Sequence, residues 1–421
     1  MLQVGGVKKN FVRFPEPFIN ITKAAMPDKK NIKVAVFIAN CGRYGVPSVV
    51  IMHHSKGKDY GIDFHYVCLE KDYLYKKLSD LGADIKVIGG RVPKAYPPNP
   101  IKLFVIFLSH LKPSLDIFRN IRSYLKQTQP DLLYTHNITE HILGGLAAKS
   151  CGIKAIGHSH VMYNQKRNLG LSRIIVSIAL NWSLDMILAV SNSARDSLWG
   201  PVKKKTFPIY GGRDIQNIHN TAQTIAANKN CPAPDIIYIG RLTDIKKQDI
   251  LVEALGILSR EGLHFKTFFV CGEHDDSTPY YIKLRRQISR LGLEDDITFT
   301  GFVPEPYGML AKAKVSVLCC TKEGCPSLVP ESFACKTPIV VPDAGGAGEL
   351  IEDGVTGLKF TPDDPVSLAN CLRKLLENEQ LSKQLSERAF AQAKEKFTCE
   401  IHLAELRKRF EQVLENSHNN T

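Results

Sequence analysis

The amino-acid sequence predicts an α/β protein that contains two doubly wound domains. From Lys33 onward, short apolar runs alternate with longer helix-compatible segments, which is the pattern of repeated βαβ units around a parallel sheet. With 421 residues the chain is too long for one ordinary hydrophobic core. A polar stretch between Asp214 and Pro234 is typical of an interdomain linker. We therefore expect one parallel sheet on each side of this stretch.

The composition is that of a globular protein from a reducing compartment. Hydrophobic residues make up 44% of the chain and charged residues 23%. The 11 cysteines are odd in number and form no C-x-x-C pair, so neither a disulfide framework nor a zinc site is indicated. No run reaches the ~20 apolar residues of a membrane-spanning helix, and residues 1–30 lack the apolar segment of a secretory signal. We expect a cytoplasmic protein, and peripheral attachment to the inner membrane face stays open.

Positive charge is concentrated in the first half of the chain. Residues 1–212 contain 30 Lys and Arg against 13 Asp and Glu, a net +17, whereas the remainder has 25 against 29, a net −4. A basic half is expected to meet an anionic partner, such as nucleic acid, an anionic bilayer surface or a phosphate-bearing acceptor. No recognition-helix, RNP or zinc-finger pattern is present, so we expect no nucleic-acid partner. A surface that only keeps the protein in solution remains an alternative.

The first half opens with an extension, residues 1–30, ahead of a predicted strand at Val34–Ala39. Gly45 lies in the turn after this strand, where glycine lets a phosphate approach the backbone, although a plain tight turn explains it equally well. The segment Ile101–Lys126 predicts two helices divided by Pro113, either packed on the sheet or lying in a membrane interface. Further strands are predicted at Phe64–Leu69, Ile85–Ile88, Leu132–Thr135 and Met186–Val190.

Histidines follow two predicted strands of this half at the point where each strand ends. His136 follows Leu132–Thr135, and His158 and His160 end the next apolar run. The carboxyl ends of parallel strands face the crevice of such folds, where a neutral imidazole can hold a hydroxyl group or move a proton. The pair at i, i+2 could also bind a metal, but no carboxylate or cysteine completes a ligand set, so we expect none. A purely structural role remains open for His136.

The second half begins with a strand at Ile236–Ile239 and a glycine turn that carries two cations. Arg241 and Lys246 lie five positions apart after this strand, a spacing that allows them to clamp a diphosphate from two sides. A later strand, Ile297–Thr300, is followed by a loop with Phe302 and Val303. A strand is also predicted at Lys266–Cys271, and helices at Tyr280–Leu291, Pro365–Glu377, Ser382–Lys394 and Glu400–Val413.

Two carboxylates flank a strand-to-helix turn in the middle of this half. The apolar strand Val315–Cys320 leads into a loop with Glu323, and Glu331 lies on the helix that follows. Gly324 allows close backbone approach to a ligand, and Pro326 defines the turn into the helix. The start of a helix directs N–H groups at an anion, so acids on both sides suit a phosphate with hydroxyls at each end, as in a sugar nucleotide. The alternative is a surface glutamate plus a helix-capping one.

The segment EGCPSLVPE resembles the E-x7-E signature of the retaining glycosyltransferases of family 4, which have the GT-B fold. Gly240-Arg241-Leu242 with Lys246, and the His158-Ser-His160 run, resemble two further motifs of that family. The chain departs from the family pattern at Tyr44, Pro47, Gly211 and Lys247. The resemblance implies two facing Rossmann-like domains with a C-terminal helix that crosses back to the first. It divides the chain into an extension (1–30), an acceptor domain (31–214), a linker (215–234), a donor domain (235–396) and a crossing helix with tail (397–421).

The resemblance implies transfer of a hexose or N-acetylhexosamine, with retention of configuration, to a glycan or lipid-linked acceptor. The donor is a nucleotide sugar, with UDP as the expected carrier, and it is a co-substrate: no cofactor and no metal are expected, because cations neutralise the diphosphate. Peripheral contact with an anionic membrane would fit a lipid-linked acceptor. Two other hypotheses remain open, namely a catalytically silent sugar-nucleotide-binding protein, which the departures motivate, and a UDP-sugar epimerase.

The resemblance also assigns roles to individual residues. Glu323 and His158 are the expected catalytic residues, and Glu331 is expected to hold the ribose. The full donor-binding set comprises Arg241, Lys246, Glu331, Gly324, Cys325, Pro326, Ser327, Leu328, Gly45, Phe302 and Val303. The residues expected to contact the transferred sugar or the acceptor are His160, His136 and Tyr44.

Overall fold

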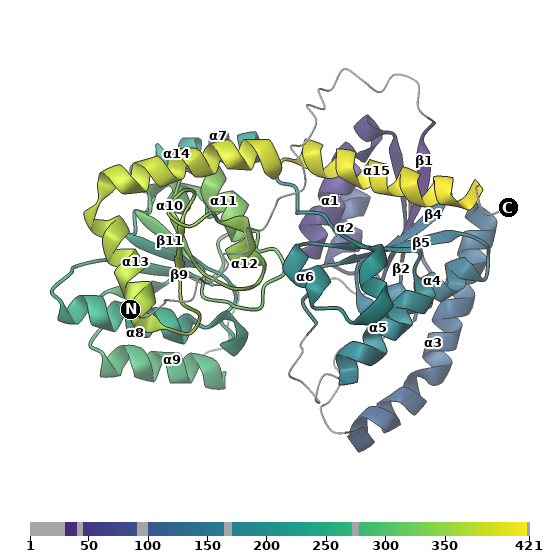
Figure 1. Cartoon of the computed structure of the whole chain (residues 1–421), viewed down its shortest axis with the longest axis horizontal. Coiled ribbons are helices and arrows are strands. Elements are labelled where there is room, and N and C mark those ends of the chain that lie inside the picture. Colours follow the sequence, from purple (N-terminus) through teal and green to yellow (C-terminus); the bar gives the residue numbers. More distant parts are fainter. Residues whose placement is uncertain (1–29, 40–44, 91–99, 164–170, 272–277, 419–421) are drawn as a thin grey trace, which may run out of the picture.

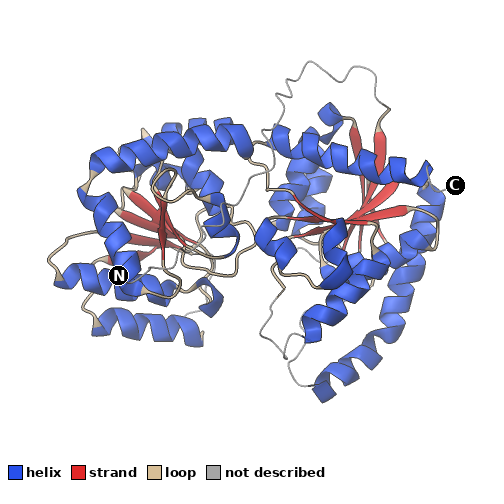
Figure 2. Ribbon diagram, viewed as in Figure 1, coloured by secondary structure: helices blue, strands red, loops and turns tan. Residues whose placement is uncertain are grey.

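The computed structural model describes residues 30–39, 45–90, 100–163, 171–271 and 278–418. They form two α/β domains that lie side by side, each with a parallel sheet between two layers of helices (Figures 1 and 2). The predicted fold class is confirmed. Residues 1–29, which cover nearly all of the predicted extension, lie outside the described residues.

The first domain is built on a sheet of seven parallel strands within the described residues. After β1 the chain adds β2 and β3 toward one edge of the sheet, and from β4 it adds β5, β6 and β7 toward the other edge. The direction in which strands are added therefore reverses between β1 and β4. In doubly wound folds, ligands bind beside the carboxyl ends of the two strands at such a reversal, here β1 and β4. From edge to edge the strands are β3 (Ile85–Val87), β2 (Ile62–Cys68), β1 (Ile32–Ile38), β4 (Leu132–Thr135), β5 (Lys154–Ser159), β6 (Met186–Ala189) and β7 (Thr206–Pro208).

Helices cover both faces of this sheet because its central strands are apolar on both sides. All four residues of β4 are buried, as are all four of β6. One face packs against α1 and α2, and the other against α3, α4 and α5. The helices are α1 (Val46–Lys56), α2 (Tyr73–Asp80), α3 (Pro100–Thr128), α4 (Ile138–Lys149), α5 (Leu171–Ser183) and α6 (Asn192–Asp196), with 3₁₀ turns η1 (Gly57–Tyr60) and η3 (Gly200–Lys205).

The prediction that Pro113 divides the segment 101–126 into two helices is wrong. Pro113 lies inside the single helix α3. A proline removes one backbone hydrogen bond, but here the packing of the following turns on the sheet continues the helix. Ile117 and Ile121 are fully buried in that contact.

The second domain repeats the same topology with six parallel strands in its described part. Here the reversal lies between β8 and β11. The strands are β10 (Ile297–Phe299), β9 (Thr267–Val270), β8 (Ile236–Ile239), β11 (Val315–Val317), β12 (Ile339–Pro342) and β13 (Leu358–Phe360). The helices are α7 (Ile215–Ala226), α8 (Gln248–Arg260), α9 (Pro279–Arg290), α10 (Tyr307–Lys312), α11 (Leu328–Ala334), α12 (Gly345–Leu350), α13 (Pro365–Glu377) and α14 (Glu379–Lys396), with the 3₁₀ turn η4 (Asp244–Lys246).

The segment 215–234, expected to be a polar linker, contributes the helix α7 to the second domain. Asp214 caps this helix by accepting a hydrogen bond from the Asn217 N–H. Ile215, Ile218 and Ala222 recur at helical spacing and are buried in the core beside α10, α11 and α14. The sequence analysis missed the helix because a narrow apolar stripe suffices when the partner surface is already apolar.

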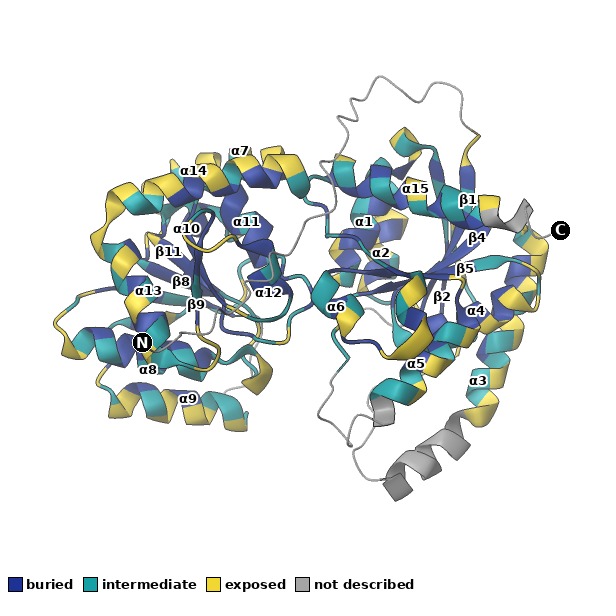
Figure 3. Ribbon diagram, in the orientation of Figure 1, coloured by how far each residue is buried: buried dark blue, intermediate teal, exposed yellow. Residues whose placement is uncertain are grey.

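The C-terminal helix crosses back to the first domain, as predicted. The chain leaves the second domain after α14, and α15 (Cys399–His418) lies across the first domain (Figure 1). Leu403, Leu406 and Phe410 of α15 are fully buried in the same core as α1 and α2. Figure 3 shows this division, with buried residues on the helix faces that meet each sheet and exposed residues facing outward.

None of the described helices combines the length and apolar character that a membrane-spanning segment requires.

Candidate active site

Residues 318–331, the loop after β11 together with the first turn of α11, lie at the carboxyl end of β11 beside the end of β8, and we call them the acidic loop. Glu323 follows β11, and Glu331 lies on the first turn of α11. The turn after β8 is shaped by two hydrogen bonds: the Gln248 amide donates to the Arg241 carbonyl at 2.7 Å, and the Tyr238 hydroxyl donates to the Lys246 carbonyl at 2.9 Å. This turn places Lys246 against the acidic loop.

Lys246 and Glu323, which are 77 positions apart in the sequence, form an ion pair. Both side chains are half-buried, with 21% and 17% of their surface exposed. The Arg241 side chain is exposed and forms no ion pair with a described residue. The two predicted phosphate-binding cations therefore lie on one turn, but in different environments.

A second ion pair holds the other end of the acidic loop. The Arg213 Nε atom lies 3.4 Å from Glu331 Oε1, and both side chains are less than one-fifth exposed. Arg213 lies where the chain passes between the domains, and its backbone pairs with Thr398 at the start of the returning segment. The sequence analysis did not single out Arg213 and missed this contact, since no local signal connects positions 118 residues apart.

The residue after Lys246 shows why one departure from the family pattern is tolerated. Lys247 stands where the family has glycine, and its φ of 56° lies in the left-handed region that favours glycine. Its ammonium pairs with the Asp363 carboxylate. The turn keeps its shape despite the lysine.

Five histidines gather at the strand ends of the first domain, four of them buried and His160 partly exposed, and we call them the histidine cluster. They come from α1, from the ends of β4 and β5, and from the returning helix α15. The members are His53, His136, His158, His160 and His402. The ring centroids of His158 and His160 are 4.2 Å apart, and those of His136 and His160 are 5.3 Å apart. His402 was missed by the sequence analysis, because only the crossing of α15 brings it here.

Hydrogen bonds define the protonation of part of this cluster. His402 Nδ1 lies 2.7 Å from the Tyr210 carbonyl, which can only accept, so this nitrogen carries the proton. His402 Nε2 therefore accepts from His53 Nε2 at 2.8 Å. The Tyr134 hydroxyl lies 2.6 Å from His158 Nδ1, and His136 Nδ1 lies 3.0 Å from His160 Nε2.

All five rings are neutral at pH 7. Burial, strengthened by neighbouring histidines, lowers the pKa of His53, His136 and His158 well below the ordinary value. Burial also lowers the pKa of His160 to about 3 and that of His402 to about 4. Neutral imidazoles can accept and donate hydrogen bonds without adding charge to the crevice.

Two nitrogen atoms of the cluster are left without a partner. His136 Nε2 and His158 Nε2 are buried and have no hydrogen-bond partner among the described residues. Buried polar atoms are normally satisfied, so an orphaned pair suggests a place for a ligand. One ring nitrogen from each of His136, His158 and His160 lies within 4.8 Å of the other two.

The acidic loop and the histidine cluster meet across the domain interface. An added Cβ at Gly324 would lie 3.0 Å from the His160 carbonyl oxygen and 2.8 Å from Val190. Cys325 packs on the same small apolar patch as Val190, and burial raises the pKa of its thiol. Gly324 is therefore required for this close approach. The structure thus brings the predicted acids and histidines from both domains to one region.

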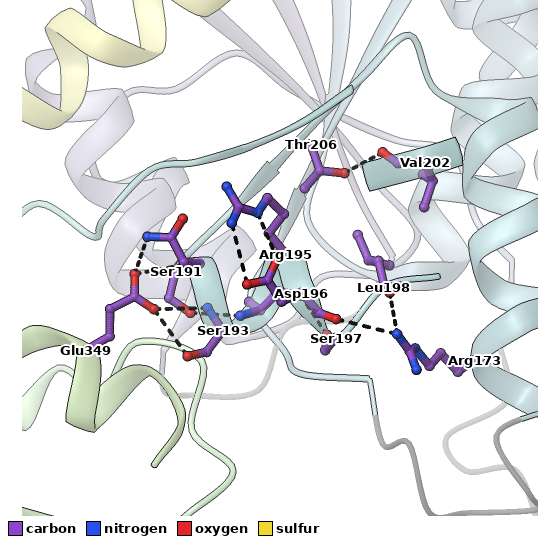
Figure 4. A network of polar contacts seen from close by, with 12 residues as sticks. Arg173, Ser191, Ser193, Arg195, Asp196, Ser197, Leu198, Val202, Thr206 and Glu349 are labelled. Carbon is purple, nitrogen blue, oxygen red and sulfur yellow. Dashed lines mark hydrogen bonds and ion pairs between the residues drawn. The ribbon is translucent and has the colours of Figure 1, made fainter. Parts of the chain in front are cut away.

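Glu349 of α12 connects the second domain to the first in the same region (Figure 4). Its carboxylate accepts hydrogen bonds from the backbone N–H groups of Asn192 and Ser193 at 2.8 and 2.9 Å. The Asn192 amide, the Ser193 hydroxyl and the Tyr210 hydroxyl donate to it as well. Burial, together with Glu349, raises the pKa of the Tyr210 phenol. Sequence analysis did not single out Glu349.

The remaining residues predicted to bind the donor take no part in the two ion pairs of the acidic loop. The Phe302 side chain is half exposed, and Val303 packs at the margin of the second-domain core. Pro326 and Leu328 are buried at the turn into α11, and Ser327 precedes that helix. Gly45 precedes α1 with φ 77°, and nothing lies within 4 Å of where its Cβ would be. Tyr44 lies outside the described residues.

Two facing doubly wound domains, with a C-terminal helix that crosses back to the first, are the arrangement of the GT-B fold. The family model described as Glycosyl transferases group 1 matches residues 222–392, and that described as Glycosyltransferase Family 4 matches residues 72–217. Together with the two-domain α/β fold, the two models support a glycosyltransferase with the GT-B fold.

Curated relatives support this assignment. An uncharacterized glycosyltransferase of Methanocaldococcus jannaschii is 24% identical over 82% of this chain and 94% of its own length. The alpha-D-kanosaminyltransferase of Streptomyces kanamyceticus is 28% identical, but the match covers 37% of this chain and 40% of the relative. A Campylobacter jejuni enzyme that transfers N-acetylgalactosamine to a diphospho-undecaprenol-linked sugar is 28% identical over 56% and 62%. The chain spans less than two thirds of the last two relatives.

Solved structures share the fold. Anabaena HepE, in a complex with UDP and glucose, superposes with a TM-score of 0.75 over 90% of this chain and all of that chain, at 19% identity. The sucrose-phosphate synthase of Thermosynechococcus elongatus has a TM-score of 0.72 over 92% and 100%, at 17% identity.

Proposed function

We propose that this glycosyltransferase moves a hexose or N-acetylhexosamine from a UDP-linked donor to a glycan or lipid-linked acceptor, with retention of configuration. The observation that carries the proposal is the pair of half-buried ion pairs, Lys246–Glu323 and Arg213–Glu331, at the two ends of one loop that faces neutral histidines of the other domain. Each carboxylate can accept hydrogen bonds from sugar hydroxyls, and each cation can donate charge-assisted hydrogen bonds to a phosphate.

The donor diphosphate would lie between Arg241, Lys246 and the start of α11. Negative charge grows on the diphosphate as the glycosidic bond breaks, so preorganised cations beside it lower the barrier, and no metal is needed for this role. Lys246 would exchange its contact with Glu323 for one with the phosphates. Glu323 is then released to bind the donor sugar, while Glu331 holds the ribose hydroxyls.

The first domain would complete the sugar site with His158 and His160. The orphaned Nε2 atom of His158 is available to a sugar hydroxyl, because its Nδ1 is already engaged by Tyr134. His136 presents a second orphaned nitrogen in the same cluster. A ligand that satisfies both would gain more than one that leaves them unpaired, which is a basis for sugar selectivity.

The names of similar proteins support the donor and acceptor classes. The HepE structures contain UDP and UDP-glucose, which supports a UDP-linked donor here. Two Campylobacter relatives act on diphospho-undecaprenol-linked sugars, which supports a lipid-linked acceptor.

An apolar stripe on the first domain supports peripheral contact with an anionic membrane. Ile175, Ile178 and Trp182 recur at helical spacing along the exposed side of α5, and 69% of the Trp182 surface is exposed. The Lys149 ammonium lies 5.7 Å from the Trp182 ring centroid, and residues 1–212 carry a net positive charge. Apolar and aromatic side chains beside cations are the combination that binds an anionic bilayer surface.

The deciding experiment measures UDP release from a panel of UDP-sugars, with and without a lipid-linked or oligosaccharide acceptor. Acceptor-dependent release supports the proposal. Sugar isomerisation without acceptor would show the epimerase instead, and donor binding without turnover would show the silent binding protein. The anomeric configuration of the product, determined by NMR, tests retention.

Glu323→Gln tests the site assignment in the same assay. We expect turnover to fall at least ~10²-fold with donor binding retained, because the Glu323 carboxylate is proposed to act on the donor sugar mainly in the transition state. Glu305→Gln, an exposed glutamate in the same domain, is the matched control. Wild-type turnover in Glu323→Gln would show that the acid is not part of the site.

A further inference from the structure

We propose that His136, His158 and His160 form a binding site for a transition-metal ion, best suited to Zn²⁺, at the floor of the crevice. The sequence excluded a metal because two histidines at i, i+2 lacked a third ligand. The fold supplies that ligand by placing the end of β4 beside the end of β5, where the two strands pair. Metal binding itself does not depend on the proposed reaction.

The spacing of the three rings suits one small ion. A ring nitrogen from each histidine lies within 4.8 Å of the other two. Tetrahedral zinc at about 2.0–2.1 Å from each nitrogen would need the nitrogens about 3.3 Å apart. Rotation of the imidazole rings can supply a shift of about this size. His136 Nε2 and His158 Nε2 have no described hydrogen-bond partner to give up when they move onto an ion.

A neighbouring hydroxyl orients one ligand from behind. The Tyr134 oxygen lies 2.6 Å from His158 Nδ1. When His158 Nδ1 carries the proton and donates it to this oxygen, the Nε2 lone pair faces the cluster. Metal-bound histidines commonly donate their other ring N–H in this way, which fixes the tautomer and the ring orientation.

The ligand set selects the kind of ion. It consists of nitrogen atoms, whereas Mg²⁺ and Ca²⁺ prefer oxygen ligands. Imidazole suits zinc, copper and cobalt, and copper is expected to bind more tightly than zinc to the same nitrogens. The His53 ring centroid lies 6.2 Å from that of His136, and the His402 ring centroid lies 6.1 Å from that of His158. A water molecule, or one of these two rings after rotation, can therefore complete the coordination.

An ion at this site would inhibit sugar transfer, and this consequence rests on the proposed function. It would occupy the same nitrogen atoms that are assigned to the sugar and would place positive charge in the crevice. Zinc is then expected to compete with the donor, although the reaction itself needs no metal.

The test is a titration of the full chain, free of any affinity tag, with Co²⁺, whose visible ligand-field bands report tetrahedral coordination. We expect one site that loses at least about tenfold in affinity in His136→Gln, His158→Gln and His160→Gln, and about tenfold in Tyr134→Phe. His264→Gln, an exposed histidine outside the cluster, should bind as the wild type does. Circular dichroism verifies that each variant is folded.

X-ray absorption on the zinc-loaded wild-type chain provides a readout that needs no variant. We expect a shell of imidazole nitrogens at about 2.0–2.1 Å. A sulfur shell would overturn the site, because it would assign the ion to cysteines. Absence of the tetrahedral cobalt bands, or wild-type cobalt affinity in the three histidine variants, would do the same. Cobalt binding without donor competition would leave the site standing and refute only its inhibitory role.

Discussion

Adding one methyl group at Gly346 tests the packing that positions Glu323. Gly346 is the second residue of α12, and its N–H donates to the Glu323 carbonyl at 2.8 Å. A Cβ at this position would lie 1.6 Å from the Gly324 carbonyl oxygen. Because ordinary contacts need about 3.5 Å, the acidic loop and α12 would have to separate by roughly 2 Å, which breaks that hydrogen bond.

The expected loss follows from these distances. Overpacking costs about 1–3 kcal/mol and the broken hydrogen bond about 0.5–1.5 kcal/mol, so Gly346→Ala should lower the free energy of unfolding by about 2–4 kcal/mol. For a domain of this size each kcal/mol lowers Tm by about 2–4 °C. Displacement of Glu323 by more than 1 Å should also reduce kcat/KM by about 10²-fold.

Thermal unfolding and UDP release measure both effects. Gly211→Ala is the matched control, since the nearest atom to its Cβ lies at 3.9 Å and no strain is expected. A Gly346→Ala variant with the wild-type Tm and turnover would refute the contact between α12 and the acidic loop, and with it the explanation of how Glu323 is placed.

Three further predictions concern the interface and the histidines. Arg213→Gln removes the partner of Glu331, so the Kd for the donor should rise about tenfold, measured by calorimetry; an unchanged Kd would place the Arg213–Glu331 pair outside the donor site. In Glu349→Gln an amide N–H₂ group replaces one of the two oxygens that accept from the Asn192 and Ser193 backbone N–H groups. The two domains should then separate more readily, and small-angle scattering should show a larger radius of gyration. A scattering curve identical to that of the wild type would contradict this role of Glu349. Stability should fall with acidification from pH 7 to pH 5, because His402 has a pKa of about 4 when folded and 6.5 when unfolded, so the unfolded chain binds more protons. Protonation of His402 in the unfolded chain alone should lower the free energy of unfolding by about 2 kcal/mol at pH 5. If urea unfolding gave the same free energy at pH 7 and pH 5, the His402 ring would not be buried and neutral.

Much of the fold could be predicted because its signals are local. The strands β8 and β11 begin where the apolar runs predicted, since burial of a parallel strand on both faces leaves a continuous apolar stretch. Boundaries failed where packing overrode a local rule. Pro113 did not end α3, and the polar segment after Asp214 became α7, in both cases because a neighbouring apolar surface stabilised the helix.

The site was predictable only in part. Glu323, Glu331 and Lys246 were singled out as candidates because they stand in short motifs at strand ends, and the structure pairs Lys246 with Glu323. Arg213 and Glu349 were missed because their partners lie more than 100 residues away in the sequence.

The sequence by itself determined the class of fold, the edge of each sheet that carries polar residues, and the acids and cations of the second half, because periodicity, glycine turns and motif spacing are properties of neighbouring residues. Only the tertiary structure decided which of these groups meet. The gathering of the His136, His158 and His160 nitrogens depends on the pairing of β4 with β5, and the arrival of His402 depends on the crossing of α15. The contact between Gly324 and His160 depends on how the two domains are placed relative to each other. That placement results from packing distributed over both domains and the crossing helix, which no short segment encodes.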